Sequence, residues 1–183
     1  MSNFKHTSVL LKETLEGLNI RDNLTYVDAT FGYGGISQHI LASANCKLVA
    51  LDQDPDVCAK AKEFIELYKK RFTFIIGKFG NLEENLKRKK IGSISGGIVA
   101  DLGVSSMQLD NPMRGFSFMQ NGPLDMRMSK DGLTAKEVVN TLSEDELSSI
   151  FWKYGEEKNS RRIAKGIVNN RKNNTITTTF DLV

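Results

Sequence analysis

The sequence lacks the features that mark membrane and secreted proteins. It contains no run of about 18 apolar residues, the length that a helix needs to cross a bilayer, and its first residues carry no apolar signal-peptide segment. Only two cysteines occur, Cys46 and Cys58, and their spacing is not that of metal ligands. We therefore expect buried thiols in a reducing compartment, no membrane partner and no bound metal.

Neither sign of charge is in large excess. The 183 residues include 25 Lys and Arg against 22 Asp and Glu, for a net charge of +3, and 40% of the residues are hydrophobic. This composition is typical of an ordinary soluble protein with a mild basic excess. The length suits one domain with a sizeable core, or one domain and part of a second.

The most informative segment runs from Tyr26 to Gly35. A short apolar strand ends in Asp28, and a turn containing Gly32 and Gly34 leads into a helix. Glycines tolerate positive φ and let a ligand approach the backbone, while the free N–H groups at a helix start favour negative charge. The pattern predicts a nucleotide-like cofactor over this turn; a purely structural tight turn is the alternative.

A carboxylate at the end of the next strand favours the cofactor interpretation. The strand 46–52 ends in Asp52, 20 residues after Gly32. In nucleoside-binding β-α-β units an acid at this spacing accepts hydrogen bonds from the two ribose hydroxyls. We therefore predict that Asp52 binds ribose.

The turn also departs from the dinucleotide fingerprint. G-x-G-x-x-G requires a glycine where this chain has Ser37. Asp28, before the turn, would repel a pyrophosphate but could pair with a cationic amino acid or sulfonium group. The residues thus favour S-adenosylmethionine over a nicotinamide cofactor, and a nicotinamide-dependent oxidoreductase is the disfavoured alternative.

Strands and helices alternate through the first hundred residues. Strands are expected at 24–28, 46–52, 72–76 and 97–101, and helices at 9–18, 35–44, 55–70 and 81–90. Such alternation indicates an α/β fold with a parallel, doubly wound sheet. We assign residues 1–106 to this domain.

A helical unit is expected at residues 107–183. Ser143 opens a capping box for a helix that should stop at Gly155. A basic helix is expected at 157–172, and Thr179 should cap a further helix. Because four strands are few for a sheet of this type, we expect the chain to be part of a longer protein.

Motifs along nearly the whole chain match those of one family. They are HTSVLLKE (6–13), DATFGYGG (28–35), DLGVSSMQLD (101–110), RGFSF (114–118), GPLDMRM (122–128), YGEE (154–157) and RRIA (161–164). The chain thereby resembles the RsmH/MraW family, bacterial methyltransferases of small-subunit ribosomal RNA that use S-adenosylmethionine.

The resemblance implies a class I, Rossmann-like methyltransferase fold with a helical RNA-recognition insert after the fourth strand. It implies N4-methylation of one cytidine in the decoding centre. The implied partner is the small ribosomal subunit with its 16S rRNA, rather than DNA, in the bacterial cytoplasm. The oligomeric state is left open, with a homodimer as one option.

Residues that match the family motifs are expected to contact the cofactor. Many members have His where this chain has Ile36, a change that is harmless if the contact uses the backbone N–H and alters binding if it uses the imidazole. The expected contacts are Gly34, Gly35, Ile36, Asp52, Phe79, Asp101 and Gln108.

The catalytic residues are less clearly marked. A cytosine amine is a weak nucleophile that needs hydrogen-bond acceptors, and amino-group methyltransferases commonly place an acid, two prolines and an aromatic after the fourth strand. The segment that begins at Asp101 lacks the prolines and the aromatic. Phe116 or Phe118 is the candidate for base stacking, with core packing as the alternative. For the acceptor candidates, the alternative is hydrogen bonding within local turns. These acceptor candidates are Asp101, Ser105, Ser106, Asp110 and Asp125.

Basic residues near the end of the chain are candidates for RNA contact. Lys158 to Lys172 holds six basic residues and no acid. A solvated helix face, with Ile163 and Ile167 packed inward, is the alternative. The predicted phosphate contacts are Arg127, Lys158, Arg161, Arg162 and Lys165.

His6 and His39 are expected to have structural roles. A non-enzymatic alternative also stays open for the whole chain, in which it is a fragment that binds cofactor or RNA without turnover.

Overall fold

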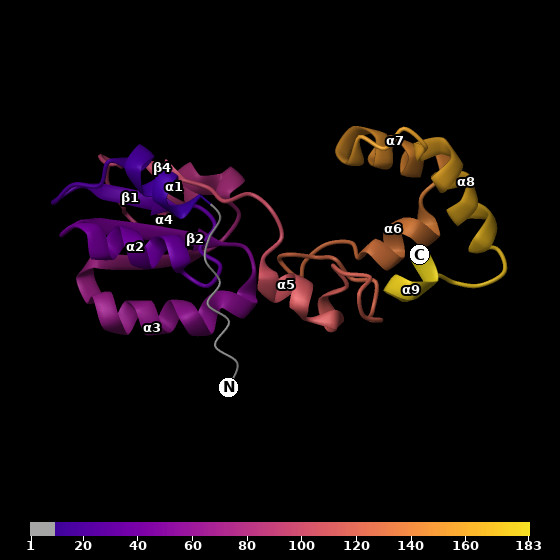
Figure 1. The fold of residues 1–183 in the computed structure, drawn as a ribbon, viewed down its shortest axis with the longest axis horizontal. Coiled ribbons are helices and arrows are strands. Elements are labelled where there is room, and N and C mark those ends of the chain that lie inside the picture. The colour runs from indigo at the N-terminus through magenta and orange to yellow at the C-terminus, as the bar shows by residue number, and fades with distance from the viewer. Residues whose placement is uncertain (1–9) are drawn as a thin grey trace. The chain divides into compact units, whose positions relative to one another are not determined.

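A computed structural model describes residues 10–183, and its ribbon is shown in Figure 1. The chain divides into two compact units between Gly103 and Val104, whereas the sequence-based boundary follows residue 106. His6 lies outside the described residues. Within the described range, none of the helices combines the length and apolar character needed to cross a membrane.

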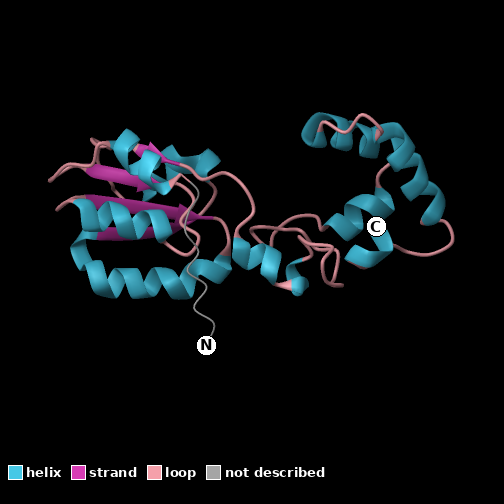
Figure 2. Ribbon diagram, viewed as in Figure 1, coloured by secondary structure: helices cyan, strands magenta, loops and turns pink. Residues whose placement is uncertain are grey.

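The first unit is built on a parallel four-stranded sheet. Its strands are β1 (Thr25–Asp28), β2 (Lys47–Asp52), β3 (Phe72–Ile76) and β4 (Ile98–Val99), in the order β3-β2-β1-β4. Thr25 pairs with Lys47, and Leu48 with Phe72. This Rossmann-like arrangement confirms the predicted α/β class, and Figure 2 shows the strands enclosed by helices.

Helices cover both faces of the sheet. On one face, Val27, Val49 and Ile75 form a buried cluster with Leu82 and Leu86 of α4 (Leu82–Arg88). Side chains alternate between the two faces of a strand, so the neighbours of these residues point the other way. The sheet is therefore doubly wound, as the sequence predicts.

An aromatic cluster fills the opposite face. The ring of Phe64, from α3 (Cys58–Tyr68), lies 5.1 Å from that of Phe31 and 5.3 Å from that of Phe72. These centroid distances are typical of favourable aromatic pairs. The cluster lies directly beneath the glycine turn, because Phe31 belongs to that turn.

Strand β4 is shorter than the predicted 97–101. Its backbone pairs with β1 only at Ile98 and Val99. Asp101 then donates its N–H to the hydroxyl of Thr30 at 2.7 Å rather than to a neighbouring strand. The predicted extension is wrong because this side-chain contact replaces the ladder.

The remaining helices of the first unit follow the predicted pattern with shifted ends. The predicted helix 55–70 is divided, because Asp54 caps a short 3-10 turn before α3 begins. The elements are α1 (Leu11–Leu18), α2 (Gly35–Ser43), η1 (Pro55–Val57), η2 (Lys69–Arg71) and η3 (Phe79–Asn81).

The second unit is helical. It contains α5 (Ser106–Asp110), η4 (Pro112–Arg114), α6 (Ala135–Thr141), α7 (Glu144–Gly155), α8 (Ser160–Asn170) and α9 (Thr179–Leu182). Ser143 caps α7 through the predicted capping box with Glu146. Thr179 is not a cap: the hydroxyl of Thr178 accepts the N–H of Asp181, which makes Thr178 the N-cap of α9.

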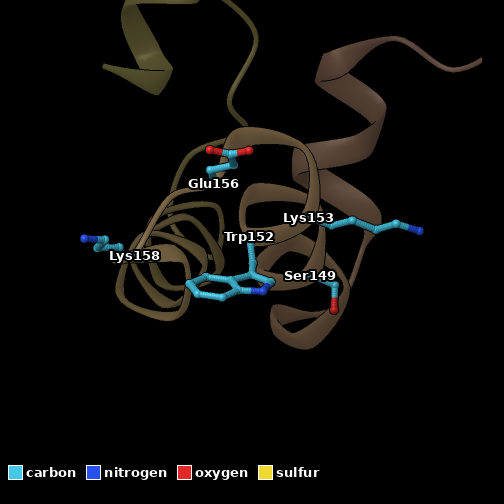
Figure 3. Close-up of a pocket in the computed structure, with 5 residues that line it drawn as sticks. All are labelled: Ser149, Trp152, Lys153, Glu156 and Lys158. Carbon is cyan, nitrogen blue, oxygen red and sulfur yellow. The ribbon is translucent and has the colours of Figure 1, made fainter.

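The turn between α7 and α8 also differs from the prediction. Gly155 is the last residue of α7, and Glu156 takes the left-handed conformation, with φ 51°. The N–H of Glu156 donates to the carbonyl of Trp152, which closes the helix end. A shallow pocket lies at this turn (Figure 3).

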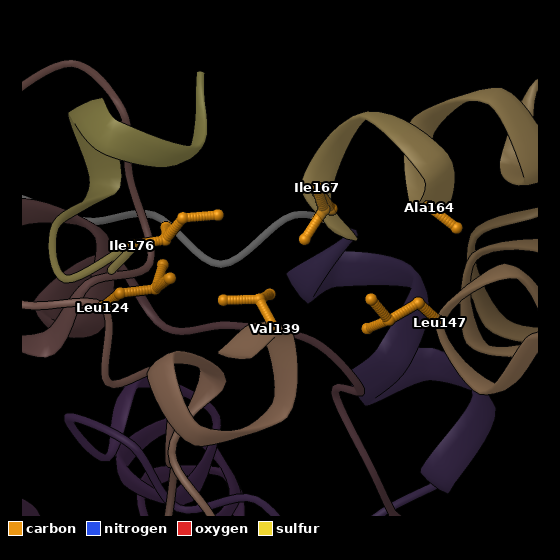
Figure 4. Packing of buried hydrophobic residues seen from close by; sticks show 6 residues of the cluster. All are labelled: Leu124, Val139, Leu147, Ala164, Ile167 and Ile176. Carbon is orange, nitrogen blue, oxygen red and sulfur yellow. The ribbon is translucent and has the colours of Figure 1, made fainter. Parts of the chain in front are cut away.

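A separate hydrophobic core holds the second unit together. Figure 4 shows its six buried side chains, which come from three helices and from the segments before α6 and α9. Ile163 is 39% exposed and outside this cluster, whereas Ile167 is buried, so the inward packing that belongs to the alternative of a solvated helix face is correct for Ile167 and wrong for Ile163. The six are Leu124, Val139, Leu147, Ala164, Ile167 and Ile176.

Candidate cofactor site

The glycine turn joins β1 to α2 at the carboxyl edge of the sheet. Gly34 has a φ of 78° and donates its N–H to the carbonyl of Phe31 at 2.8 Å. A Cβ at Gly34 would stand 2.5 Å from a ring atom of Phe64. Both the left-handed backbone and the ring beneath it therefore require glycine here.

Asp52 holds this turn from the neighbouring strand. One carboxylate oxygen accepts the N–H of Gly32 at 2.8 Å, and the other accepts the N–H of Asp54 at 2.9 Å. Burial raises the pKa of Asp52, and these hydrogen bonds partly offset the rise. Each carboxylate oxygen has a second lone pair, so the half-buried group can also accept the hydroxyls of a ribose.

Asp28 is not accessible to a ligand, which differs from the predicted pairing with a cationic ligand group. Its side chain is 0% exposed, and its carboxylate accepts hydrogen bonds from the Ser37 hydroxyl at 2.6 Å and the Thr30 N–H at 3.1 Å. Burial raises the pKa of Asp28 to about 6. The expected direct pairing with a cationic ligand group is wrong, because the first turn of α2 covers the carboxylate.

Other predicted contacts gather at the same edge. Asp101, exposed after β4, lies close enough to Asp28 for its charge to raise the pKa of that residue, and Asp52 acts in the same direction. Phe79 follows β3 and is 48% exposed. The carboxyl edge of the sheet is therefore acidic and bordered by an aromatic ring.

Ile36, which stands where many family members have His, is packed inside the protein. Its side chain is buried, in the first turn of α2. The side chain therefore cannot reach a ligand over the turn, and the group left for such a contact is the backbone N–H. This favours the interpretation in which the absence of His is harmless.

Several remaining candidates lie in the second unit and are engaged in local structure. Ser105 caps α5, where its hydroxyl accepts the N–H of Gln108, and the Gln108 side chain accepts the N–H of Ser105 in return. Asp125 forms a two-pronged ion pair with Arg127, at 2.7 and 3.1 Å, which lowers the pKa of Asp125. Ser106 begins α5 and Asp110 ends it.

The aromatic and basic candidates differ in exposure. Phe118 is 67% exposed, so its predicted alternative of core packing is wrong, while Phe116 is half-buried with its ring 5.8 Å from the Arg114 guanidinium. Lys158 is exposed just before α8. Three further basic side chains are exposed along α8 itself, those of Arg161, Arg162 and Lys165. Arg171 points inward and donates to the carbonyl of Val139.

The cysteine prediction is correct at one of the two positions. Cys46 is buried, which raises the pKa of its thiol, whereas Cys58 is only half-buried at the start of α3. His39 is exposed, and its Nδ1 lies 2.8 Å from the Gly35 carbonyl. This contact fits the structural role expected for the histidine.

The parallel sheet, the glycine turn and the acid at the end of β2 define a Rossmann-like methyltransferase unit. A model of the MraW methylase family matches residues 3–183, and the chain belongs to this family. Membership implies a methyl donor.

Curated relatives agree with this assignment. The chain is 52% identical over 177 residues to the ribosomal RNA small subunit methyltransferase H of Rickettsia massiliae, covering 97% of this chain and 56% of the relative. It is 49% identical over 178 residues to the protein of the same name from Ehrlichia canis, covering 97% and 60%. The chain thus spans less than two thirds of the length of these relatives.

Proposed function

We propose that this chain is the cofactor-binding and RNA-recognising part of an enzyme that methylates N4 of one cytidine in the decoding centre of 16S ribosomal RNA. The methyl donor is S-adenosylmethionine, and the substrate is the small ribosomal subunit in the bacterial cytoplasm. The observation that carries the proposal is the contact between Asp52 and Gly32, which builds a nucleoside-type site in a member of the MraW methylase family.

The residues at the edge of the sheet suit this donor. Asp52 has lone pairs left for the ribose hydroxyls, and the first N–H groups of α2 can receive the carboxylate of the amino-acid portion. Asp52 and Asp101 make the edge acidic, which favours a cationic ligand over a pyrophosphate. Bound S-adenosylmethionine supplies an electrophilic methyl group.

Asp101 is the proposed hydrogen-bond acceptor for the cytosine amine. It is exposed, it follows β4, and its backbone is fixed by the Thr30 hydroxyl. Among the acceptor candidates it is the one that belongs to the same unit as the glycine turn. A carboxylate that accepts an amine hydrogen concentrates the nitrogen lone pair and stabilises the charge that develops during attack.

The decisive experiment is methyl transfer from labelled S-adenosylmethionine to small subunits that lack the modification, with the nucleosides identified by mass spectrometry. We expect N4-methylcytidine at one site, abolished by Asp52→Ala and unaffected by Glu66→Ala, an exposed acid on α3. The assay includes a version of the protein with the length of the curated relatives. Absence of transfer by both versions would overturn the proposal.

A further inference from the structure

The second unit carries an exposed tryptophan in a pocket of about 700 Å³. Trp152 is the only tryptophan in the sequence and is 61% exposed. Figure 3 shows the indole with Lys153 and Lys158 extending on opposite sides of it. The lining residues are Ser149, Trp152, Lys153, Glu156 and Lys158, which we call the Trp152 pocket.

Helix geometry explains why the indole faces outward. Leu147 is fully buried and Phe151 is half-buried on the inner face of α7. The next residue, Trp152, is rotated by about 100° from Phe151 around the helix axis. Its exposure is thus fixed by the register of α7, while large aromatic side chains normally gain stability by burial.

The turn after α7 brings a second lysine to the indole. Glu156 holds the left-handed conformation, in which a side chain other than glycine is strained. Its N–H donates to the Trp152 carbonyl, and the N–H of Glu157 donates to that of Phe151. This tight reversal places Lys158 in the same pocket as Trp152.

The charge around the pocket favours a polyanion. Lys153 and Lys158 outnumber the single acid of the lining, Glu156. The first turn of α8 adds the exposed Arg161 and Arg162. Within residues 10–183, no carboxylate forms an ion pair with Lys158 or with either arginine. These cations are therefore available to phosphates.

We propose that the Trp152 pocket binds an unpaired nucleotide of an RNA strand, with the base stacked on the indole and the flanking phosphates near Lys153 and Lys158. Aromatic side chains stack on bases of any sequence, provided that the base is not held in a duplex. Ser149 and Glu156 add polar groups for the base edge. The proposal rests on the proposed function for the identity of the RNA, and it deepens that function by naming a contact.

The test uses the intrinsic fluorescence of Trp152 in the 183-residue chain. We expect saturable quenching by a single-stranded oligoribonucleotide, and none by a duplex of the same sequence or by heparin, a polyanion without bases. Equal quenching by all three would reduce the pocket to an electrostatic surface and overturn the proposal. Quenching by ribosomal-protein peptides but not by the single strand would overturn it in favour of a protein partner.

Labelled-oligonucleotide anisotropy then tests the variants. Trp152→Ala should weaken binding by about 5-fold to 150-fold, the range expected for loss of one stacked base. Trp152→Phe should retain most of the affinity. Phe180→Ala, which removes another exposed aromatic of the same unit, should leave affinity unchanged. Wild-type affinity in a folded Trp152→Ala chain, verified by circular dichroism, would overturn the proposal.

The two proposals fail separately. Oligonucleotide binding requires no cofactor and no turnover, so a negative binding result alongside methyl transfer to small subunits would overturn only the Trp152 pocket. Specific quenching without methyl transfer by either length of the protein would overturn only the proposed function.

Discussion

The carboxylate of Asp52, at the end of β2, accepts the backbone N–H of Gly32 at 2.8 Å, and Gly32 lies in the turn that follows β1. The residue expected to bind ribose therefore also fixes the loop on which the cofactor would lie. Cofactor affinity and the local stability of the turn should change together when this carboxylate is altered.

Asp52→Asn should change stability and cofactor binding in ways that substitution of an ordinary surface acid does not. An amide keeps one acceptor oxygen and replaces the other with an NH2 donor, so either the Gly32 or the Asp54 N–H loses its acceptor, and we expect a loss of about 1–3 kcal/mol in the free energy of unfolding. The thermal stabilisation given by S-adenosylmethionine should also disappear. Glu66→Gln is the matched control, and an unchanged thermal shift in Asp52→Asn would contradict the assignment.

Gly34→Ala should destabilise the first unit. The new Cβ would lie 2.5 Å from Phe64 and 2.9 Å from Phe31, at a φ of 78°. We expect a loss of at least about 2 kcal/mol in urea unfolding, from overpacking and backbone strain together. Gly17→Ala, in α1 and with no atom within 4 Å of the new Cβ, should instead be neutral or slightly stabilising. Similar effects of the two substitutions would contradict this account.

Asp28 should make stability depend on pH. Its pKa is raised by burial to about 6 in the folded protein, from 3.8. The folded state therefore binds more protons between these values, and the free energy of unfolding falls as pH rises through this window, by about 3 kcal/mol.

Asp28→Asn removes that titration and leaves the rest of the protein's pH dependence in place. The stability of the variant relative to the wild type should therefore increase from pH 4 to pH 7, measured by urea unfolding at intervals. The raised pKa of Asp52 affects both proteins alike. Parallel curves for the two proteins would show that Asp28 does not titrate in this range.

Asp101→Asn should lower methyl transfer by more than it weakens cofactor binding, because Asp101 is both an expected cofactor contact and the proposed acceptor for the amine. An amide is a weaker acceptor than a carboxylate, and loss of one preorganised electrostatic contact typically costs about 10²-fold or more in kcat. Rates on small subunits and the thermal shift with S-adenosylmethionine are measured in the same preparations. Full activity in Asp101→Asn would move the acceptor role to another residue.

Glu156→Gly should stabilise the second unit. Glycine adopts the left-handed conformation without strain, so we expect a gain of about 1 kcal/mol in the free energy of unfolding. Lys153→Gly, in the right-handed interior of α7, should lose about the same amount. The opposite signs of these two changes, read by urea unfolding, provide the check.

The sequence predicted the features of the first unit that depend on local pattern. The glycine turn, the four strands and Asp52 at its spacing follow from residues that are neighbours along the chain. The length of β4 could not be predicted in the same way, because it depends on a hydrogen bond between Asp101 and Thr30, which are 71 residues apart. The burial of Asp28 likewise depends on Ser37 folding back over it.

The helical unit shows the same limit. The capping box at Ser143 is a local signal and was predicted correctly. Glycine preference pointed to Gly155 as the residue after the helix, but the tertiary turn uses Glu156. Trp152 carried no sequence signal, because an aromatic residue beside an apolar one is normally core. Only the rotation of α7 reveals its exposure.

The hydrogen bonds that join Gly122 and Thr179 have a consequence for how this family can change. The N–H of Thr179 donates to the Gly122 carbonyl, and the N–H of Gly122 donates to the Thr179 hydroxyl. The segment between Gly122 and Thr179 therefore begins and ends at adjoining positions, and it contains α6, α7 and α8. We call this segment the helical cassette. A cassette with adjoining ends can be lengthened, shortened or exchanged without altering the path of the chain outside it. The sequence of this helical segment can thus change while the glycine turn of the first unit keeps its geometry.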